Sequence, residues 1–209
     1  MRIKKTFDQH SADRVAEAIR LAESKTSGEI VPVVLEQSDP YAYLDFIGGV
    51  AGQLLGVLAL IWTLPACNTL AVLGVQVLGF VAGFLLVRYC PPLKRVLLPP
   101  KVAEEEVFDR ALRAFREFEL DRTRDRTGVL IFVSRMERRI QVLADSGINA
   151  RVSPGTWNEV VALVLSGIRE GDICQGLCEA IERCGQVLAR EFPLRPDDIN
   201  ELPNRLQQG

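Results

Sequence analysis

Charged residues are missing from a long central part of this sequence. Between Phe46 and Val87 there is no Lys, Arg, Asp, Glu or His. A helix that spans a membrane needs about 20 mostly apolar residues, so this run is too long for one such helix and suits two. Pro65 and a short polar stretch after it interrupt the run. The sequence therefore predicts a transmembrane helical hairpin, with helices at Leu44–Leu64 and Thr69–Tyr89.

The alternative interpretation of this run is a long buried helix of a soluble protein. Such a helix carries polar residues at helical spacing along one side, where it meets solvent. Away from the predicted turn, the uncharged segment offers only Gln53 and Gln76 for such a polar side. This shortage of polar residues favours the membrane hairpin.

Basic residues flank the uncharged run on both sides and are absent from its central turn. Lys and Arg accumulate on the cytoplasmic side of membrane proteins. No apolar signal-peptide core follows Met1, and five cysteines, an odd number, fit a reducing compartment better than a disulfide framework. We therefore expect a multi-pass protein of the bacterial inner (cytoplasmic) membrane with both termini in the cytoplasm. The flanking residues are Lys4, Lys5, Lys25, Arg88, Lys94, Arg95 and Lys101.

A surplus of basic charge is also missing. The chain has 25 Lys and Arg residues against 27 Asp and Glu residues, a formal net charge of −2. Domains that bind nucleic acids typically carry a basic patch, and here the cluster Arg122, Arg124 and Arg126 alternates with Asp121 and Asp125. We therefore expect no nucleic-acid partner. The expected partner is the lipid bilayer, whose anionic headgroups attract each nearby basic residue by about 1 kcal/mol.

Helix and strand patterns alternate outside the hairpin. The continuous apolar run Val129–Ser134 is typical of a buried strand, and the alternating segment Arg139–Ala144 is close enough to form an antiparallel hairpin with it. Pro32 lacks a backbone donor, which predicts an edge position or a bulge for the strand Glu29–Glu36. Gly28 is expected to have positive φ after the first helix. The predicted helices are Ser11–Lys25, Val102–Leu120, one that begins after a capping box of Thr156 and Glu159, and Ile173–Glu191 after Asp172 and Gln175.

This order of elements predicts an α/β fold in which helices cover both faces of a small mixed sheet, interrupted by the transmembrane helical hairpin. We expect Trp157, at the head of an apolar helix face, to pack on the Val129–Ser134 strand. The predicted segments are residues 1–43 (helix and strand), 44–90 (the hairpin), 91–192 (the rest of the α/β domain) and 193–209 (a polar tail, docked or frayed).

Several short motifs, in a fixed order, resemble the TPM-domain family in its bacterial membrane-protein branch. The resemblance implies a Rossmann-like α/β/α sandwich, and this branch keeps a two-helix membrane insertion. It also implies links to repair or assembly of membrane complexes and to a receptor accessory subunit, while phosphatase activity and calcium binding are attributed to other members. The motifs are Thr26–Ile30, Arg126–Ser134, Ala144–Ile148, Arg169–Asp172 with Gly176–Leu177, and Asn200–Pro203.

Motifs of familiar enzymes are absent. The sequence has no Gly-x-Ser-x-Gly nucleophile motif and no P-loop, and its single histidine, His10, begins a predicted helix and is expected to be solvated. Cys174 and Cys178 are one helical turn apart, but no residues at ligand spacing complete a four-ligand metal site with them. These residues and Cys184 are better interpreted as small buried side chains.

Two carboxylates are the candidate metal ligands. Asp125 precedes the strand Val129–Ser134 and Asp145 follows the strand Arg139–Ala144, so an antiparallel hairpin places both at one end. Glu29 joins them if its strand runs parallel to the second strand. Oxygen ligands at loop ends suit calcium. The alternative is surface ion pairing of the two aspartates with Arg124, Arg126 or Arg151. The chain also departs from the family pattern, because Asp145 replaces the usual glycine and Ser153–Thr156 replaces the usual acidic residue.

Glycines recur every four residues in the hairpin, at Gly48, Gly52 and Gly56 and again at Gly79 and Gly83. Small residues at this spacing let membrane helices approach closely. They serve either packing within the hairpin or association with another copy or a membrane-protein partner. The sequence thus predicts a membrane-anchored TPM-like domain that acts through protein interaction, as an accessory, assembly or repair factor for a membrane complex. The alternative is a metal-assisted phosphatase, with phosphate held at the start of the helix after Thr156.

Overall fold

The computed structural model describes residues 7–63, 68–195 and 201–208, and it divides into two compact units. The first, called here the α/β unit, comprises Met1–Ser38 and Glu104–Gly209. The second, called the hairpin unit, comprises Asp39–Ala103 and is inserted into the first between one strand and the helix that follows it in the α/β unit. Each unit is described in turn.

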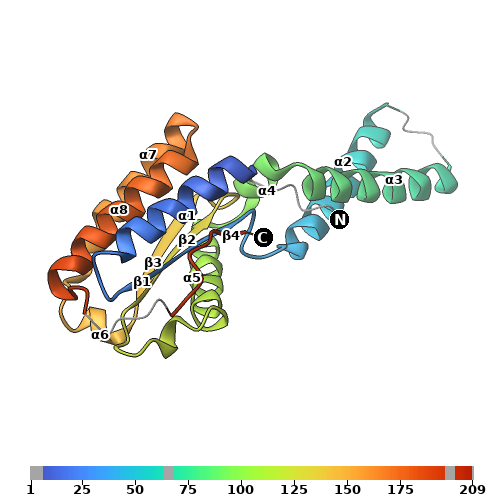
Figure 1. Ribbon diagram of the computed structural model, residues 1–209. Helices are drawn as coiled ribbons and strands as arrows, with labels where there is room; N and C mark the ends of the chain where they lie inside the picture. Colours follow the sequence, from blue (N-terminus) through green and yellow to red (C-terminus); the bar gives the residue numbers. More distant parts are fainter. Residues whose placement is uncertain (1–6, 64–67, 196–200, 209) are drawn as a thin grey trace. The chain divides into compact units, whose positions relative to one another are not determined.

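The α/β unit contains a four-stranded mixed sheet in the order β3–β2–β1–β4 (Figure 1). The strands β1 and β2 are parallel, with Glu29 opposite Gly128, and β3 is antiparallel to β2, with Ala144 opposite Val129. The short β4 is parallel to β1 on its other side. The strands are β1 (Glu29–Leu35), β2 (Gly128–Ser134), β3 (Arg139–Ala144) and β4 (Gln207–Gln208).

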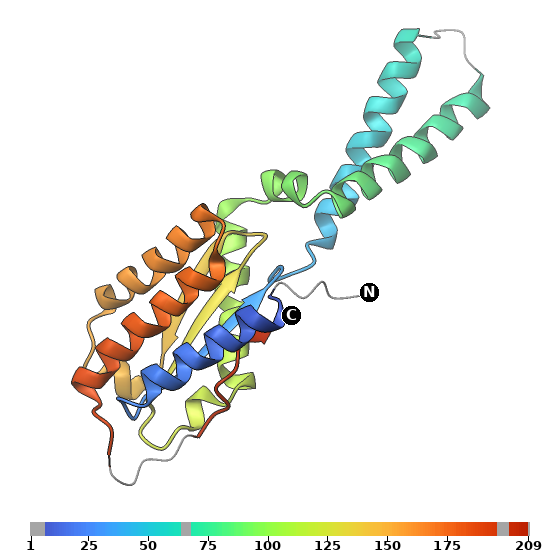
Figure 2. The same cartoon turned by 45° about the horizontal axis from the view of Figure 1, so that its top comes forward.

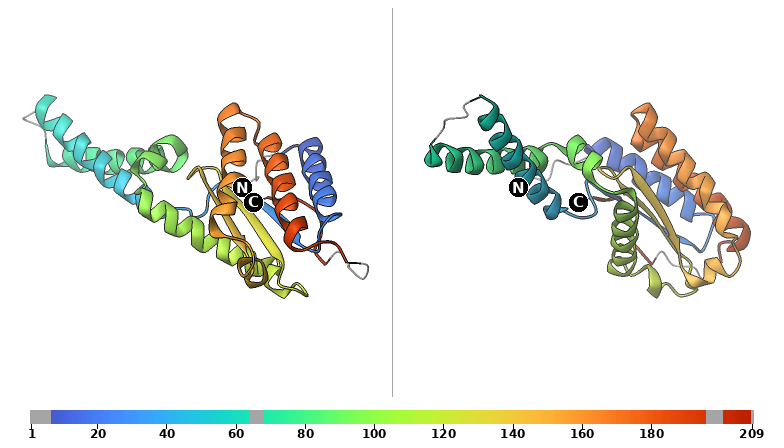
Figure 3. Two further views of the ribbon diagram at one scale, coloured as in Figure 1. Left: turned by 90° about the vertical axis from the view of Figure 1, so that its left-hand side faces the viewer. Right: turned by 180° about the vertical axis from the view of Figure 1, so that it is seen from behind.

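Helices cover both faces of this sheet, because alternate side chains of its central strands are apolar on each face. Helices α1, α7 and α8 lie on one face and α5 on the other, as Figures 2 and 3 show. On the first face Ile30 and Ile131 belong to the three-helix core, and on the second Val31 and Phe132 pack in the core of α5. The helices are α1 (Gln9–Glu23), α5 (Pro100–Glu117), α6 (Ser146–Asn149), α7 (Trp157–Glu170) and α8 (Ile173–Glu191), with 3₁₀ turns at Leu120–Arg122 and Pro154–Thr156.

The predicted α/β architecture is confirmed, and Trp157 lies in the same core as Val129 and Ile131, where only 8% of it is exposed. The expected edge position of the first strand is wrong, because β1 lies between β2 and β4 and its register with β2 runs without interruption. Within the described part of the chain, β4 pairs only with Val33 and Val34, so Pro32 there has a neighbouring strand on one side alone, where proline is tolerated.

Two local expectations at helix ends are also wrong. Gly28 does not have positive φ; a Cβ there would lie 2.9 Å from Leu188 Cδ1, so the glycine permits close packing against α8. Thr156 forms no capping box, because its backbone is already helical as the end of the 3₁₀ turn and its hydroxyl bonds to Ser153 Oγ at 3.0 Å. Asp172, by contrast, caps α8 as expected: its carboxylate accepts a hydrogen bond from the backbone N–H of Gln175 at 2.9 Å.

The hairpin unit consists of α2 (Ala42–Thr63), α3 (Thr69–Tyr89) and the short α4 (Pro91–Leu97). By length and composition, α2 and α3 are each able to span a membrane. They begin and end within two residues of the predicted segments; the predicted turn residues Pro65 and Cys67 lie outside the described residues. Asn68 caps α3, since its side chain accepts a hydrogen bond from the backbone N–H of Ala71 at 2.8 Å.

The glycines of the hairpin form close contacts between its two long helices. A Cβ at Gly79 would lie 2.6 Å from the carbonyl oxygen of Gly52, and a Cβ at Gly48 would lie 2.9 Å from that of Gly83. The two helix backbones therefore touch along the predicted small-residue faces. Their apolar side chains point elsewhere and are mostly exposed, including Phe46, Leu55, Leu58, Leu78 and Leu86.

Candidate functional site

The candidate site lies at one end of the sheet. Since β2 begins at this end and β3 finishes there, Asp125 and Asp145 lie at the same end of the sheet, as the sequence predicts. Glu29 joins them there because β1 is parallel to β2. Asp145 is held directly against β2, because its backbone N–H donates to the carbonyl oxygen of Gly128 at 2.9 Å. The chain leaves for the hairpin unit at the opposite end, after Ser38, about 20 Å away for strands of this length.

Asp145 is buried, with 8% of the residue exposed. It begins α6: its Oδ1 accepts hydrogen bonds from the backbone N–H of Ser146 at 2.6 Å and from the Ser146 hydroxyl at 3.1 Å. Its Oδ2 is buried and has no hydrogen-bond partner among the described residues. A buried carboxylate oxygen without a partner is costly, so this atom has capacity for a cation or a further donor.

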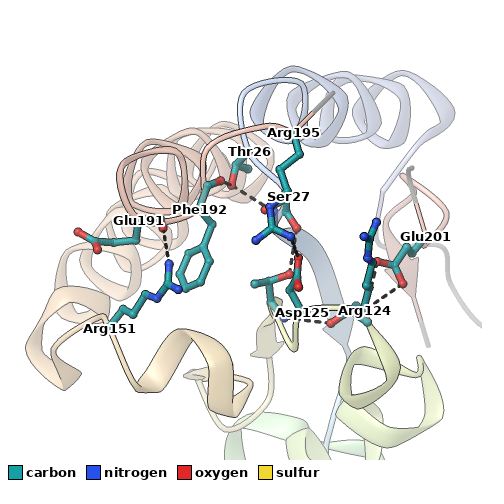
Figure 4. Close-up of polar contacts among 12 residues, drawn as sticks. Thr26, Ser27, Arg124, Asp125, Arg151, Glu191, Phe192, Arg195 and Glu201 are labelled. Atoms are coloured by element: carbon teal, nitrogen blue, oxygen red, sulfur yellow. Dashed lines mark hydrogen bonds and ion pairs between the residues drawn. The ribbon is translucent and has the colours of Figure 1, made fainter. Parts of the chain in front are cut away.

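Asp125 lies beside the same loop but has a partner. Its Oδ2 is 2.8 Å from Nη1 of Arg195, and Figure 4 shows the two side chains pointing toward each other. Its backbone contacts the loop of Asp145, because a Cβ at Gly147 would lie 2.5 Å from Asp125 O and 2.7 Å from Arg126 O. Gly147 therefore lets the two loops approach. The arginine that pairs with Asp125 is not one of the three weighed from the sequence.

The C-terminal segment covers this end of the sheet. The carboxylate of Glu201 accepts hydrogen bonds from the backbone N–H of Arg124 at 3.2 and 3.1 Å (Figure 4). The backbone N–H of Glu201 donates to Glu29 Oε1 at 2.9 Å. Leu202 packs against the core of α5, and β4 then pairs with β1. The predicted polar tail is thus docked over residues 201–208. The apolar residues Leu202 and Leu206 are the sequence signal for that docking.

A half-buried acid, Glu23, lies near this end and was missed by sequence reasoning. Its Oε1 accepts a hydrogen bond from the backbone N–H of Ile30 at 2.8 Å. Burial raises the pKa of Glu23 to about 8; the neighbouring Glu29 carboxylate adds to this rise, while the bonds from Ile30 and the Asn204 side chain oppose it. Glu23 is therefore protonated in the folded protein at neutral pH. Its position in an amphipathic helix gives no sign of this.

These acids do not converge on one point. Within residues 7–63, 68–195 and 201–208, no three His, Cys, Asp or Glu side chains come close enough to hold a metal ion together. Calcium takes six to eight oxygen ligands, so backbone carbonyls and water would have to supply most of a shell around Asp145. The calcium site at Asp125 and Asp145 remains a prediction.

The cysteine side chains of α8 pack against neighbouring residues and are not fully exposed at the surface. Cys174 and Cys184 are buried and Cys178 is half-buried. The Cys174 thiol lies 3.6 Å from the carbonyl oxygen of Ser11. Burial, and then the neighbouring Cys174 thiol, raise the pKa of Cys178 to about 11, so it is a protonated thiol at neutral pH and a poor nucleophile.

A shallow groove lies on the outer surface of the three-helix face, along α1 and next to Cys178 of α8. It has a volume of about 440 Å³ and contains the single histidine, His10, which is exposed as predicted. Leu21, 49% exposed, and Ala18 give it an apolar floor between charged side chains. The charged lining residues are Asp13, Arg14 and Glu17. This surface suits contact with a protein better than chemistry on a small molecule.

Comparison with known proteins supports the resemblance drawn from the sequence motifs. The TPM domain model matches residues 94–187, which include the motifs Arg126–Ser134, Ala144–Ile148 and Arg169–Asp172. No curated protein matches the chain. The NMR structure of the BA42 protein from the psychrophilic bacterium Bizionia argentinensis is similar, with a TM-score of 0.63 and 24% identity over 100% of this chain and 99% of that one. At that identity the likeness concerns the fold. Residues 94–187 therefore match the TPM domain family, and the chain shares its fold with the similar structure.

Proposed function

We propose that this chain is an integral protein of the bacterial inner membrane that presents its TPM domain in the cytoplasm, as an accessory, assembly or repair factor for a membrane complex. The observation that carries the proposal is the hairpin unit. Its two long helices use their small residues against each other and leave apolar side chains exposed, as lipid-facing helices do. Exposing so large an apolar surface to water would be unfavourable.

The orientation follows from the chain path and the flanking charges. The α/β unit contributes the residues on both sides of the hairpin, so both termini lie on one side of the membrane if α2 and α3 cross it. Arg88, Lys94 and Arg95 lie at or just beyond the end of α3, and no Lys or Arg occurs between Thr63 and Thr69. The positive-inside rule then assigns the α/β unit to the cytoplasm.

Two surfaces support a role in protein interaction. In the hairpin, Phe46 and Phe84 form an edge-to-face pair with ring centroids 5.4 Å apart, and Phe80 stacks on Phe84 at 6.2 Å. This aromatic cluster includes Phe46, which is 58% exposed, and is suited to a second copy or a membrane-protein partner. In the α/β unit, the groove along α1 offers Leu21 and Ala18 within a charged rim. Apolar anchors surrounded by polar residues are the usual composition of a protein interface.

Site-specific photocrosslinking tests this proposal. A photoreactive amino acid replaces Leu21 in the full-length chain, which is then purified from detergent-solubilised membranes. The matched control replaces Phe108, which is 44% exposed on α5. We expect one stoichiometric partner, crosslinked from position 21 and not from position 108. A chain that purifies alone, or that crosslinks equally from both positions, would contradict the proposal.

The alternative function is a metal-assisted phosphatase, and the buried Oδ2 of Asp145 is the observation that favours it. In this alternative Asp145 and Asp125 hold calcium or magnesium, which would polarise a bound phosphate. The ion pair with Arg195 and the contact of Glu201 with Arg124 must then open to admit substrate. A phosphate-ester assay with and without added calcium or magnesium distinguishes the two functions, because only the alternative predicts metal-dependent turnover that is lost in Asp145→Asn.

A further inference from the structure

The short helix α4, which follows α3 after a single residue, has an inverted distribution of side chains. Its lysine, Lys94, is buried with 6% exposed, whereas Val96 is 78% exposed and Leu97 is 39% exposed. A helix at a water-facing surface does the opposite and turns its apolar side chains inward. A helix that buries its charge and exposes its apolar side chains is favoured where its outer side contacts an apolar medium.

An ion pair fixes this orientation. The Lys94 ammonium forms an ion pair with Oδ1 of Asp45 at 2.7 Å and donates a hydrogen bond to the carbonyl oxygen of Pro40 at 2.8 Å. Asp45, in the first turn of α2, is 1% exposed. Removing one partner of such a buried pair leaves an uncompensated charge, so Lys94 cannot readily turn outward. Because Lys94 faces inward, the helical period turns Val96 outward.

Neighbouring residues have the character of a membrane–water boundary. Tyr89, the last residue of α3, is 74% exposed. Arg88 is 3.4 Å from Oδ2 of Asp45, and its guanidinium lies 5.9 Å from the centre of the Phe84 ring. Tyrosine and arginine at the end of an apolar helix mark the headgroup level. Arg95, on α4 itself, adds a cationic side chain next to the apolar face.

We propose that α4 is an interfacial helix whose Val96 and Leu97 side chains insert at the boundary between headgroups and acyl chains of an anionic lipid surface. The proposal rests on the membrane hairpin proposed above and extends it. Interfacial helices bury an apolar face about 5–10 Å into this boundary and keep basic residues at the phosphates. Lys94 is a positioning residue here: through Asp45 it sets which face of α4 meets the lipid.

Tryptophan quenching by lipids tests the proposal. The full-length chain is reconstituted into phosphatidylcholine–phosphatidylglycerol vesicles whose acyl chains carry bromine near the headgroups. Val96→Trp is made in a Trp62→Phe background, in which the remaining Trp157 is buried in the α/β core. The control is Phe108→Trp in the same background. We expect brominated lipid to quench the emission of Trp at position 96 and aqueous acrylamide to quench that at position 108.

The unmodified chain separates this inference from the hairpin itself. Trp62, 88% exposed near the end of α2, is quenched by brominated lipid if the hairpin is inserted. If brominated lipid quenches Trp62 but not Trp at position 96, the α4 proposal alone is overturned. If it quenches neither tryptophan, the membrane hairpin is overturned as well. Adding Lys94→Gln to the Val96→Trp variant should reduce the quenching of Trp at position 96. Lys94→Gln made alone, in the chain that keeps Trp62, should leave the quenching of Trp62 unchanged. Equal quenching at position 96 with and without Lys94 would refute its positioning role.

Discussion

The carboxylate of Glu23, at the end of α1, accepts a hydrogen bond from the backbone N–H of Ile30 in β1 at 2.8 Å. This contact joins the first helix to the first strand and holds an ionisable group in a half-buried position. Because burial raises the pKa of Glu23 to about 8, the folded chain holds a proton that the unfolded chain releases near pH 4.5. Folding is thereby linked to pH.

The stability of the domain should therefore fall as the pH rises. The contribution of Glu23 is fully present below about pH 4.5 and is lost as the pH rises through 8, because the folded state binds more protons in that window. We expect Glu23→Gln, which stays neutral, to flatten the pH dependence of the unfolding free energy between pH 5 and 8. Denaturant titrations of the full-length chain at several pH values measure this. Glu17→Gln, at an exposed position on the same helix, should leave the slope unchanged; an unaltered slope in Glu23→Gln would disprove the assignment.

Trp157 should be a major contributor to the core. It is 8% exposed and lies among Val129, Ile131 and Val160. Truncation of a large buried aromatic residue to alanine costs about 3–5 kcal/mol, so Trp157→Ala should lower the thermal midpoint by many degrees. The control is Phe108→Ala, at a half-exposed position on α5, which should have a small effect. Equal melting of the Trp157 variant and the wild type would place Trp157 in a binding surface instead.

The hairpin should tolerate a side chain at one glycine and not at another. A Cβ at Gly52 would lie 3.0 Å from Gly83 Cα, whereas a Cβ at Gly74 meets nothing within 4 Å. Overpacking of this kind costs about 1–3 kcal/mol. We expect Gly52→Leu to lower the thermal midpoint of the detergent-solubilised chain and Gly74→Leu to leave it unchanged. Equal behaviour of the two variants would mean that the helices do not pack through these glycines.

Any divalent ion that the domain binds should depend on Asp145. Two carboxylates supply a minority of the ligands that calcium needs, so the expected affinity is weak, about 10⁻⁴–10⁻³ M. Calcium titration of the full-length chain should raise the thermal midpoint, and Asp145→Asn should abolish the rise. Asp109→Asn, on the exposed side of α5, serves as the control. If calcium raises the thermal midpoint of neither the wild type nor the control at any concentration, Asp125 and Asp145 act as ordinary structural charges.

Membrane topology is testable through the native cysteine in the predicted turn. With both termini cytoplasmic, an impermeant maleimide added to spheroplasts should label Cys67 and should not label a cysteine introduced at Arg205, an exposed position. A Cys67→Ser variant shows the background from the other native thiols. Labelling at position 205 and not at position 67 would reverse the orientation.

Local patterns in the sequence were sufficient to predict most of the helices and strands. The uncharged run predicted α2 and α3, and the apolar strand runs predicted β1, β2 and β3, because burial on one or both faces imposes its period directly on the residues. The antiparallel pairing of β2 with β3 placed Asp125 and Asp145 at one end of the sheet as expected, and the parallel pairing of β1 with β2, which the sequence left open, added Glu29.

Contacts between distant segments determined what these residues do, and no local period encodes them. Asp125 is neutralised by Arg195, 70 residues later in the chain, and Glu29 is bound by the backbone of Glu201, 172 residues away. Close approach of α8 decided the role of Gly28, and the preceding 3₁₀ turn removed the expected cap at Thr156. The sequence by itself determined the helices, the strands and the apolar hairpin, because these depend on hydrophobic period. Only the tertiary structure decided which carboxylates are paired, protonated or left with an unpartnered oxygen, because those properties depend on burial and on partners that folding brings together.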